Sequence, residues 1–374
     1  MLKKISKELK NIVGWKTNRK IVIFEVDDYG ASRINPNHIG NLLKRGFNLS
    51  YFEKYDRIAK EIELKQLFNA LKSVKDKKGR YAVFSPFTIM ANPDFKIINE
   101  LNFQKYQYKP FYNTAYDIYQ ENLLYLWKQG IKDNIFLPQF HGREHFHVST
   151  WMQALNNKKS LSREAFYFDS VGLFGQNTKP EISRFAASFD VGVLDELDDQ
   201  EGIIESGLKL FEEIFAYKAI SFTPPDGFLN TNLEFVLSEL GIQTISVSRK
   251  RMVPMGNKKF NKNFNYMGKW NNSNRIKYTI RNAMFEPHSN VKTDWVNSCL
   301  QDINTSFRWR NPAVISSHRV NFLDTTPIPF NNFSGIKQLE LLLKSIIKTW
   351  PDVEFMSSGE LAQIIMNGSG KHNI

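Results

Sequence analysis

The chain has 374 residues, of which 42% are hydrophobic and 24% charged, a composition typical of a globular protein with a sizeable core. Its formal net charge of +12 suggests an anionic partner. The basic residues are dispersed, however, and no nucleic-acid recognition motif is present, so we expect no nucleic acid as a partner. The single cysteine, Cys299, excludes an intramolecular disulfide and a thiolate metal cage, so metal ligands must be nitrogen and oxygen atoms.

Apolar residues recur at helical spacing near the start of the chain, with lysines between them, which predicts a basic amphipathic helix within residues 1–19. Polar residues interrupt the apolar run that a signal peptide needs, and no uncharged apolar run of about 18 residues could span a bilayer. We therefore expect a cytoplasmic protein. The helix either packs on its own domain or lies on an anionic membrane, so a peripheral membrane contact through residues 1–15 stays open.

Short apolar runs typical of strands alternate with segments of helical periodicity along the rest of the chain. We expect strands at residues 21–26, 81–86, 134–140, 166–169, 219–223, 242–247, 313–317 and 353–356. We expect helices at residues 58–75, 115–129, 201–215, 232–240 and 335–349. This alternation predicts parallel strand pairing and an α/β fold, either a barrel or a doubly wound sheet.

Asn, Lys and Gly are frequent in residues 250–277, which we interpret as a loop insertion that forms either a long surface loop or a functional lid. No tandem repeat or low-complexity linker divides the chain. We therefore expect a single domain with insertions over residues 20–362 and a flexible tail over residues 363–374. The sequence does not indicate an oligomeric state.

Two adjacent carboxylates, Asp27 and Asp28, follow the apolar run of the first expected strand, and Tyr29 and Gly30 come next. Groups at the carboxyl end of a parallel strand face the ligand crevice. Because adjacent side chains of a strand point to opposite faces, a turn must begin here if both carboxylates serve one site. The alternative is a helix N-cap followed by an acidic residue in the first turn.

Five of the seven histidines fall in three short polar segments beside predicted strands. His141 and His145 stand four residues apart, so a helical turn would place both imidazoles on one face. With a carboxylate from another strand they would form a two-histidine, one-carboxylate site for a divalent ion, although their spacing can also arise by chance. Glu144 adjoins the second histidine, so this segment is not the His-Glu-x-x-His of zinc proteases.

Two further strand ends carry candidate groups. His318 follows the apolar run 313–317, where it is either a general acid or an ordinary hydrogen-bonded residue. Pro224 and Pro225 stiffen the loop after the expected strand 219–223, and a stiff loop can hold a backbone N–H that stabilises an oxyanion. The same Pro-Pro-Asp-Gly sequence is also typical of a plain turn.

The order Asp-Asp, His-x-x-x-His, Pro-Pro-x-Gly, Asp-Trp and Ser-x-His resembles that of the polysaccharide deacetylases, the NodB-like carbohydrate esterases, over residues 20–362. The resemblance implies a distorted (β/α) barrel and a hydrolase that removes acetyl or other acyl groups from an N- or O-acetylated sugar or glycan. It also implies one divalent metal ion, with Zn²⁺ as first choice and Co²⁺, Ni²⁺ or Mn²⁺ as alternatives. The His-Gly-Arg-Glu-His-Phe form is similar to a bacterial subgroup associated with capsule and lipopolysaccharide loci.

The same resemblance implies a role for each motif residue. Asp27 matches the catalytic base, and His318 matches the catalytic acid. The implied metal ligands are Asp28, His141 and His145. In the proline loop, the backbone N–H of Asp226 takes the oxyanion position. The expected substrate contacts are Tyr29, Arg143, His147, Pro225, Asp226, Gly227, Trp295 and Arg319. For His147 a surface role is the alternative, and for Trp295 core packing.

The chain departs from the family pattern at Thr223, where the family has an arginine that pairs with the base carboxylate. Either Arg143, Arg281 or Arg319 takes over this pairing, or the chemistry is altered. The missing arginine also leaves open a non-catalytic glycan-binding protein that keeps the metal pocket. We expect an enzyme that acts on carbon-nitrogen bonds other than peptide bonds, or on carboxylic ester bonds if the acetyl group is on oxygen.

Overall fold

The computed structural model describes residues 8, 11–172, 185–323 and 334–368. Its centre is a nine-stranded sheet with the order β10-β7-β6-β5-β2-β1-β12-β11, and β13 also pairs with β1. Each pairing in this sheet is parallel. The strands are β1 (Ile21–Tyr29), β2 (Phe84–Ile89), β5 (Gln139–Gly142), β6 (Ser221–Phe222), β7 (Thr244–Val247), β10 (Lys277–Ile280), β11 (Ala283–Met284), β12 (Ala313–His318) and β13 (Glu354–Phe355).

The sheet curls into an incomplete barrel. Its two end strands, β10 and β11, are consecutive in the chain, and only Arg281 and Asn282 separate them. Two residues can span only a short gap, so the ends of the sheet must lie close together. No hydrogen-bonded pairing joins β10 to β11 in the described residues, and this leaves a seam that Arg281 occupies. The predicted α/β fold with a distorted (β/α) barrel is confirmed.

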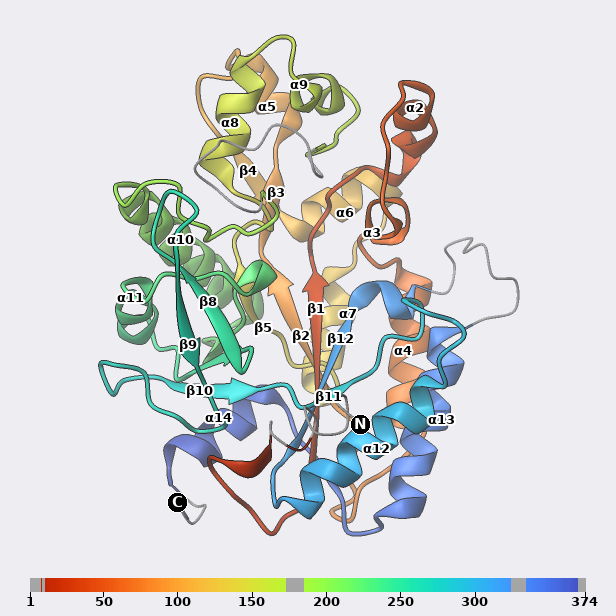
Figure 1. Cartoon of the computed structure of the whole chain (residues 1–374). Helices are drawn as coiled ribbons and strands as arrows, with labels where there is room; N and C mark the ends of the chain where they lie inside the picture. Colours follow the sequence, from red (N-terminus) through yellow and green to blue (C-terminus); the bar gives the residue numbers. More distant parts are fainter. Residues whose placement is uncertain (1–7, 9–10, 173–184, 324–333, 369–374) are drawn as a thin grey trace.

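Helices cover the outside of the barrel (Figure 1). On one side of the barrel, α12 packs on α13, and α13 packs on α4. On another side, α10 packs on both β5 and α11. The helices are α2 (Ile39–Lys44), α3 (Tyr51–Tyr55), α4 (Glu61–Lys72), α5 (Phe95–Glu100), α6 (Phe111–Tyr119), α7 (Leu124–Lys132), α8 (Val148–Asn156), α9 (Leu161–Phe166), α10 (Glu196–Phe215), α11 (Leu233–Glu239), α12 (Trp295–Arg308), α13 (Gly335–Thr349) and α14 (Ser358–Met366). Short 3-10 turns are η1 (Pro36–His38), η2 (Pro225–Gly227) and η3 (Arg319–Phe322).

The main core is built on β1, which is buried along its whole length. Its apolar residues pack on those of the neighbouring strands and of the covering helices. Above the strand tips in Figure 1 lies a group made of α5, α8, α9 and the antiparallel pair β3 (Ala91–Pro93) and β4 (Tyr108–Pro110). This group has its own apolar cluster of Ile98, Phe103, Phe146, Trp151, Leu155, Phe166, Val171 and Phe185.

Two expected elements are wrong. Phe166 ends helix α9, and Asp169 has a φ of 48°, so residues 166–169 are a helix end and a turn, not a strand. The single helix expected over residues 115–129 is two helices, α6 and α7, because Gln120 takes a left-handed conformation and ends the first. The first error reflects the ambiguity of a short apolar run, which periodicity alone cannot assign to a helix or a strand. The second arose because apolar residues continue past the end of the first helix.

Other segments add detail to the expected boundaries. Residues 250–277 contain an antiparallel hairpin of β8 (Lys250–Pro254) and β9 (Phe260–Phe264) before β10 begins. Helix α14 continues past residue 362 to Met366, so the flexible tail expected from residue 363 is wrong for residues 363–366, where the apolar residue Ile365 is buried. Most of the expected N-terminal helix, residues 1–7 and 9–10, and the end of the tail, residues 369–374, lie outside the described residues. Within the described ranges, no helix is both long and apolar enough to cross a membrane.

Candidate metal and acid-base site

The end of β1 places two adjacent carboxylates in one cavity. Asp28 has a φ of 72°, a left-handed conformation that is uncommon for a residue other than glycine. The register between β1 and β2 shifts between Val26 and Tyr29, so the strand carries an irregularity at the two aspartates. Asp27 and Asp28 consequently both line the same cavity, which an unbroken strand would not allow. Backbone strain of this kind is typical of functional sites.

The two histidines reach this cavity from β5. His141 lies on the strand, and Gly142 follows it with a φ of 127°, which favours glycine. This turn brings His145 back, so that the two ring centroids are 5.3 Å apart. The two histidines are therefore brought together by a glycine turn at the end of a strand. The helical turn that their four-residue spacing suggested is not what pairs them.

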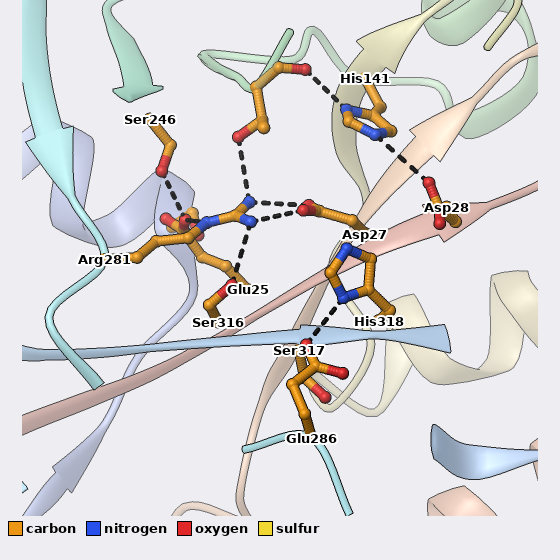
Figure 2. A network of polar contacts seen from close by, with 12 residues as sticks. Glu25, Asp27, Asp28, His141, Ser246, Arg281, Glu286, Ser316, Ser317 and His318 are labelled. Carbon is orange, nitrogen blue, oxygen red and sulfur yellow. Dashed lines mark hydrogen bonds and ion pairs between the residues drawn. The ribbon is translucent and has the colours of Figure 1, made fainter. Parts of the chain in front are cut away.

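Asp28, His141 and His145 converge on one point, as Figure 2 shows for the first two. Oδ1 of Asp28 lies 3.0 Å from Nε2 of His145 and 3.7 Å from Nε2 of His141. One ligand atom from each of the three buried residues lies within 4.8 Å of the other two. Two imidazole nitrogens and one carboxylate oxygen form a donor set that suits Zn²⁺ and similar divalent ions.

Hydrogen bonding prepares His141 to be a ligand. Its Nδ1 lies 2.6 Å from the carbonyl oxygen of Thr223, which can only accept, so Nδ1 carries the proton and Nε2 keeps its lone pair toward Asp28. Burial alone would raise the pKa of Asp28, but nearby positive charge, that of Arg33 first, holds that pKa well below its usual range. The carboxylate is therefore ionised, as a metal ligand must be. The residues present fit a divalent ion.

Asp27 forms an ion pair with Arg281. Nη2 of Arg281 donates to Oδ1 of Asp27 at 2.7 Å, and Nη1 donates to Oδ2. The same guanidinium donates from Nε to Glu25 at 2.7 Å (Figure 2). It also donates from Nη2 to Oγ1 of Thr223 at 3.1 Å. Burial would raise the pKa of Asp27, but the charge and hydrogen bonds of Arg281 lower it below the ordinary 3.8. Arg281 therefore supplies to Asp27 the guanidinium that the resemblance implied for position 223, where this chain has Thr223.

His318 ends β12 beside β1, where the strand register pairs it with Asp27. Its Nδ1 lies 2.7 Å from Oε1 of Glu286 (Figure 2). Burial lowers the pKa of His318, but Glu286, with smaller contributions from Asp28 and Asp27, outweighs it and raises the pKa to about 10. The imidazole is therefore protonated at neutral pH and can donate a proton.

These groups share a cavity of about 830 Å³. Asp226 and Gly227 line it from the proline loop, and Trp295 and Phe52 line it from α12 and α3. Pro225 is buried within η2, and Asp226 has a φ of 54°. Trp295 donates from Nε1 to the carbonyl oxygen of Asn290, and the preceding Asp294 caps α12.

Five of the eight expected substrate contacts do not line this cavity, namely Pro225, Tyr29, Arg319, Arg143 and His147. Tyr29 packs edge-on against Trp127 and Phe136 in the core. Arg319 is buried in an ion pair with Asp56.

Arg143 and His147 instead line a separate cavity of about 370 Å³. There Arg143 pairs with Glu144 and donates to Ser206, and Nε2 of His147 lies 3.0 Å from the carbonyl oxygen of Asp190. Of the three arginines considered as partners for the base, only Arg281 contacts Asp27, because Arg143 and Arg319 have other carboxylates.

Sequence reasoning did not identify Arg33 or Glu286. Arg33 donates from Nη2 to Oδ2 of Asp28 at 3.3 Å, and the same nitrogen lies 3.4 Å from Nε2 of His145. Glu286 follows β11. Neither residue stands in a motif, so only the packing of the strands reveals them.

No family model matches this chain, and no curated protein matches it. Solved structures similar to the chain include a protein from Mycobacterium smegmatis described as a candidate polysaccharide deacetylase, with 11% identity, a TM-score of 0.45, and coverage of 97% of this chain and 96% of that one. A 4-alpha-glucanotransferase from Thermococcus litoralis has 10% identity and a TM-score of 0.46, and the match covers 92% of this chain and 40% of that one. A CE4 family pseudoenzyme from Bacillus anthracis has 12% identity and a TM-score of 0.37, with coverage of 92% and 66%. All three TM-scores are below 0.5, so the functional argument rests on the residues of the cavity.

Proposed function

We propose that this protein is a metal-dependent hydrolase that removes an acetyl or other acyl group from a sugar or glycan, as the resemblance of its motifs to the polysaccharide deacetylases implies. The observation that carries this proposal is the convergence, in one cavity, of the Asp28–His141–His145 cluster, the Asp27–Arg281 pair and His318, which Glu286 holds in an ion pair. A cluster of metal ligands alone would suit a structural ion. A base and an acid beside it suit hydrolysis.

Asp28, His141 and His145 would hold the ion. When bound, a divalent ion supplies polarisation of the acyl carbonyl and a lowered pKa for a coordinated water. Asp27, kept ionised by Arg281, accepts the proton that the attacking water loses. The oxygen of that water forms a bond to the acyl carbon, and the bond from this carbon to the sugar nitrogen or oxygen then breaks.

His318 completes the reaction by giving its proton to the departing amine or alkoxide. Glu286 supports this role because its charge keeps the imidazole protonated. We assign the oxyanion contact to the backbone N–H of Asp226. Pro224 and Pro225 stiffen the loop that carries it, and the N–H of Gly227 donates to the Pro224 carbonyl oxygen at 2.9 Å. Trp295 and Phe52 provide aromatic surface for a sugar ring, with Asp226 and Gly227 as further contacts.

The alternative of a non-catalytic glycan-binding protein rested on the missing arginine at Thr223. Arg281 supplies a guanidinium to the base, which removes that reason. The expected links to capsule or lipopolysaccharide sugars and to the cytoplasm belong to the same proposal.

The test is an acetate-release assay on the purified protein, first stripped with a chelator and then supplied separately with Zn²⁺, Co²⁺, Ni²⁺ or Mn²⁺. Substrates are nucleotide-linked, lipid-linked and polymeric N-acetyl sugars, with O-acetylated sugars as a second set. We expect release that depends on the added ion. Glycan binding without release under every ion would support the non-catalytic alternative.

A further inference from the structure

We propose that Arg249 forms an anion subsite in the active cavity, and that the substrate therefore carries a phosphate or carboxylate group near its acylated sugar. The inference rests on the proposed function, because it specifies the substrate class of the same cavity. The observation that carries the proposal is that Arg249 lines this cavity and forms no ion pair with a carboxylate of the residues that the structure describes.

The other arginines that line the cavity, and His318, are held in ion pairs, whereas Arg249 is not paired with a carboxylate of the described residues. The side chains that line the cavity include three arginines and His318. Arg281 pairs with Asp27 and Glu25, and Arg33 pairs with Asp28 and Asp56.

His318 pairs with Glu286, so Arg281, Arg33 and His318 each have a carboxylate partner. Among the residues that the structure describes, no carboxylate oxygen lies within 4.0 Å of the Arg249 guanidinium. Asp226 and Asp302 line the cavity too, but neither forms an ion pair with Arg249 in that part of the chain. The Arg249 charge therefore remains available to a ligand.

The backbone at Arg249 is held in place. The residue lies between β7 and β8, and its carbonyl oxygen accepts from the backbone N–H of Asn265 at 2.7 Å. Two residues on, the buried Arg251 donates to Glu234 at 2.6 Å and to the Leu229 carbonyl oxygen at 2.6 Å. These bonds anchor the start of β8, so that only the half-buried side chain of Arg249 needs ordering when a ligand binds.

The chemistry of the group fits an oxyanion. A guanidinium presents paired N–H donors that match the oxygens of a phosphate or carboxylate. The net charge of +12 also favours the approach of an anionic substrate over a neutral one. A neutral acetylated sugar would leave this charge without a partner.

The experiment compares three acetylated sugars: N-acetylglucosamine, its 1-phosphate and N-acetylmuramic acid, which carry no charge, a phosphate and a carboxylate. Acetate release gives kcat/KM for each, and isothermal titration of each sugar to the metal-loaded protein gives Kd. The variants are Arg249→Gln and Arg249→Lys. The control is Arg275→Gln, because Arg275 pairs with Glu239 and does not line the cavity.

For the wild type we expect at least one charged sugar to be favoured about tenfold or more over the neutral one in kcat/KM or Kd. Arg249→Gln removes that preference, Arg249→Lys keeps part of it, and Arg275→Gln keeps it in full. The favoured sugar identifies phosphate or carboxylate as the group recognised.

Equal treatment of all three sugars by the wild type, or an equal loss for charged and neutral sugars in Arg249→Gln, would overturn the subsite. Absence of acetate release from every sugar with every ion would instead count against the proposed function. The titration still decides the subsite in that case, because binding preference does not require turnover.

Discussion

Arg281 and Asp27 form an ion pair across 254 positions of the sequence. Arg281 stands at the seam of the barrel, between the two end strands of the sheet, and its side chain is 16% exposed. It also binds Glu25, which lies two residues before Asp27 on the same face of β1. A residue at the seam thus supplies to Asp27 the positive charge that the resemblance implied one position before the proline loop, at Thr223.

Arg281→Gln should reduce kcat/KM about 100-fold and move the acidic limb of the pH–rate profile to higher pH. Asp27 must be ionised to accept a proton, so activity falls as pH drops through its pKa. Arg281 lowers that pKa, and without it the loss begins at a higher pH. Measurement of kcat/KM against pH tests this. Bound metal, measured by atomic emission, should be unchanged, and an unshifted acidic limb would contradict the pairing.

The motif residues themselves were predictable, because Asp27, Asp28, His141, His145 and His318 stand at strand ends that the apolar pattern marks. The arginine that pairs with Asp27 could not be predicted, because the choice between Arg143, Arg281 and Arg319 depends on how the sheet closes. Periodicity identifies strands but not their spatial order. For the same reason it could not show that Arg143, two residues after His141, lines a different cavity.

Asp27→Asn and His141→Ala should separate the base from the metal ligands. Asp27→Asn removes the proton acceptor and leaves the three ligands in place, so turnover should be lost while the ion stays bound. His141→Ala removes one of the three ligands, so the bound ion and the turnover should both be lost. Metal content and acetate release are measured on the same samples. Normal activity in Asp27→Asn would disprove its role as the base.

Arg33→Gln should tighten metal binding about tenfold or more. One guanidinium nitrogen of Arg33 lies 3.3 Å from Asp28 and 3.4 Å from His145, so an ion held by these residues meets a positive charge nearby. Competition with a chelating dye gives the Kd for Zn²⁺ or Co²⁺. Arg275→Gln is the control, because Arg275 pairs with Glu239 and not with a metal ligand. Weaker binding in Arg33→Gln would mean that Arg33 instead positions Asp28 for the ion.

Glu286→Gln should move the basic limb of the pH–rate profile to lower pH. His318 must be protonated to act as the acid, so activity is lost as pH rises through its pKa. Burial lowers this pKa, but Glu286 and the nearby aspartates raise it to about 10. Without the Glu286 charge, the pKa falls toward or below the ordinary 6.5.

Two measurements check this last prediction. An NMR titration of the His318 ring in the metal-free protein should give a pKa near 10 for the wild type and a lower value for Glu286→Gln. The pH dependence of kcat/KM should move in the same direction. Glu286→Asp, which keeps the negative charge, should recover much of the wild-type behaviour. If Glu286→Gln lowered kcat/KM equally at every pH, Glu286 would only hold the imidazole in place, and the charge of the pair would have no part in the acid step.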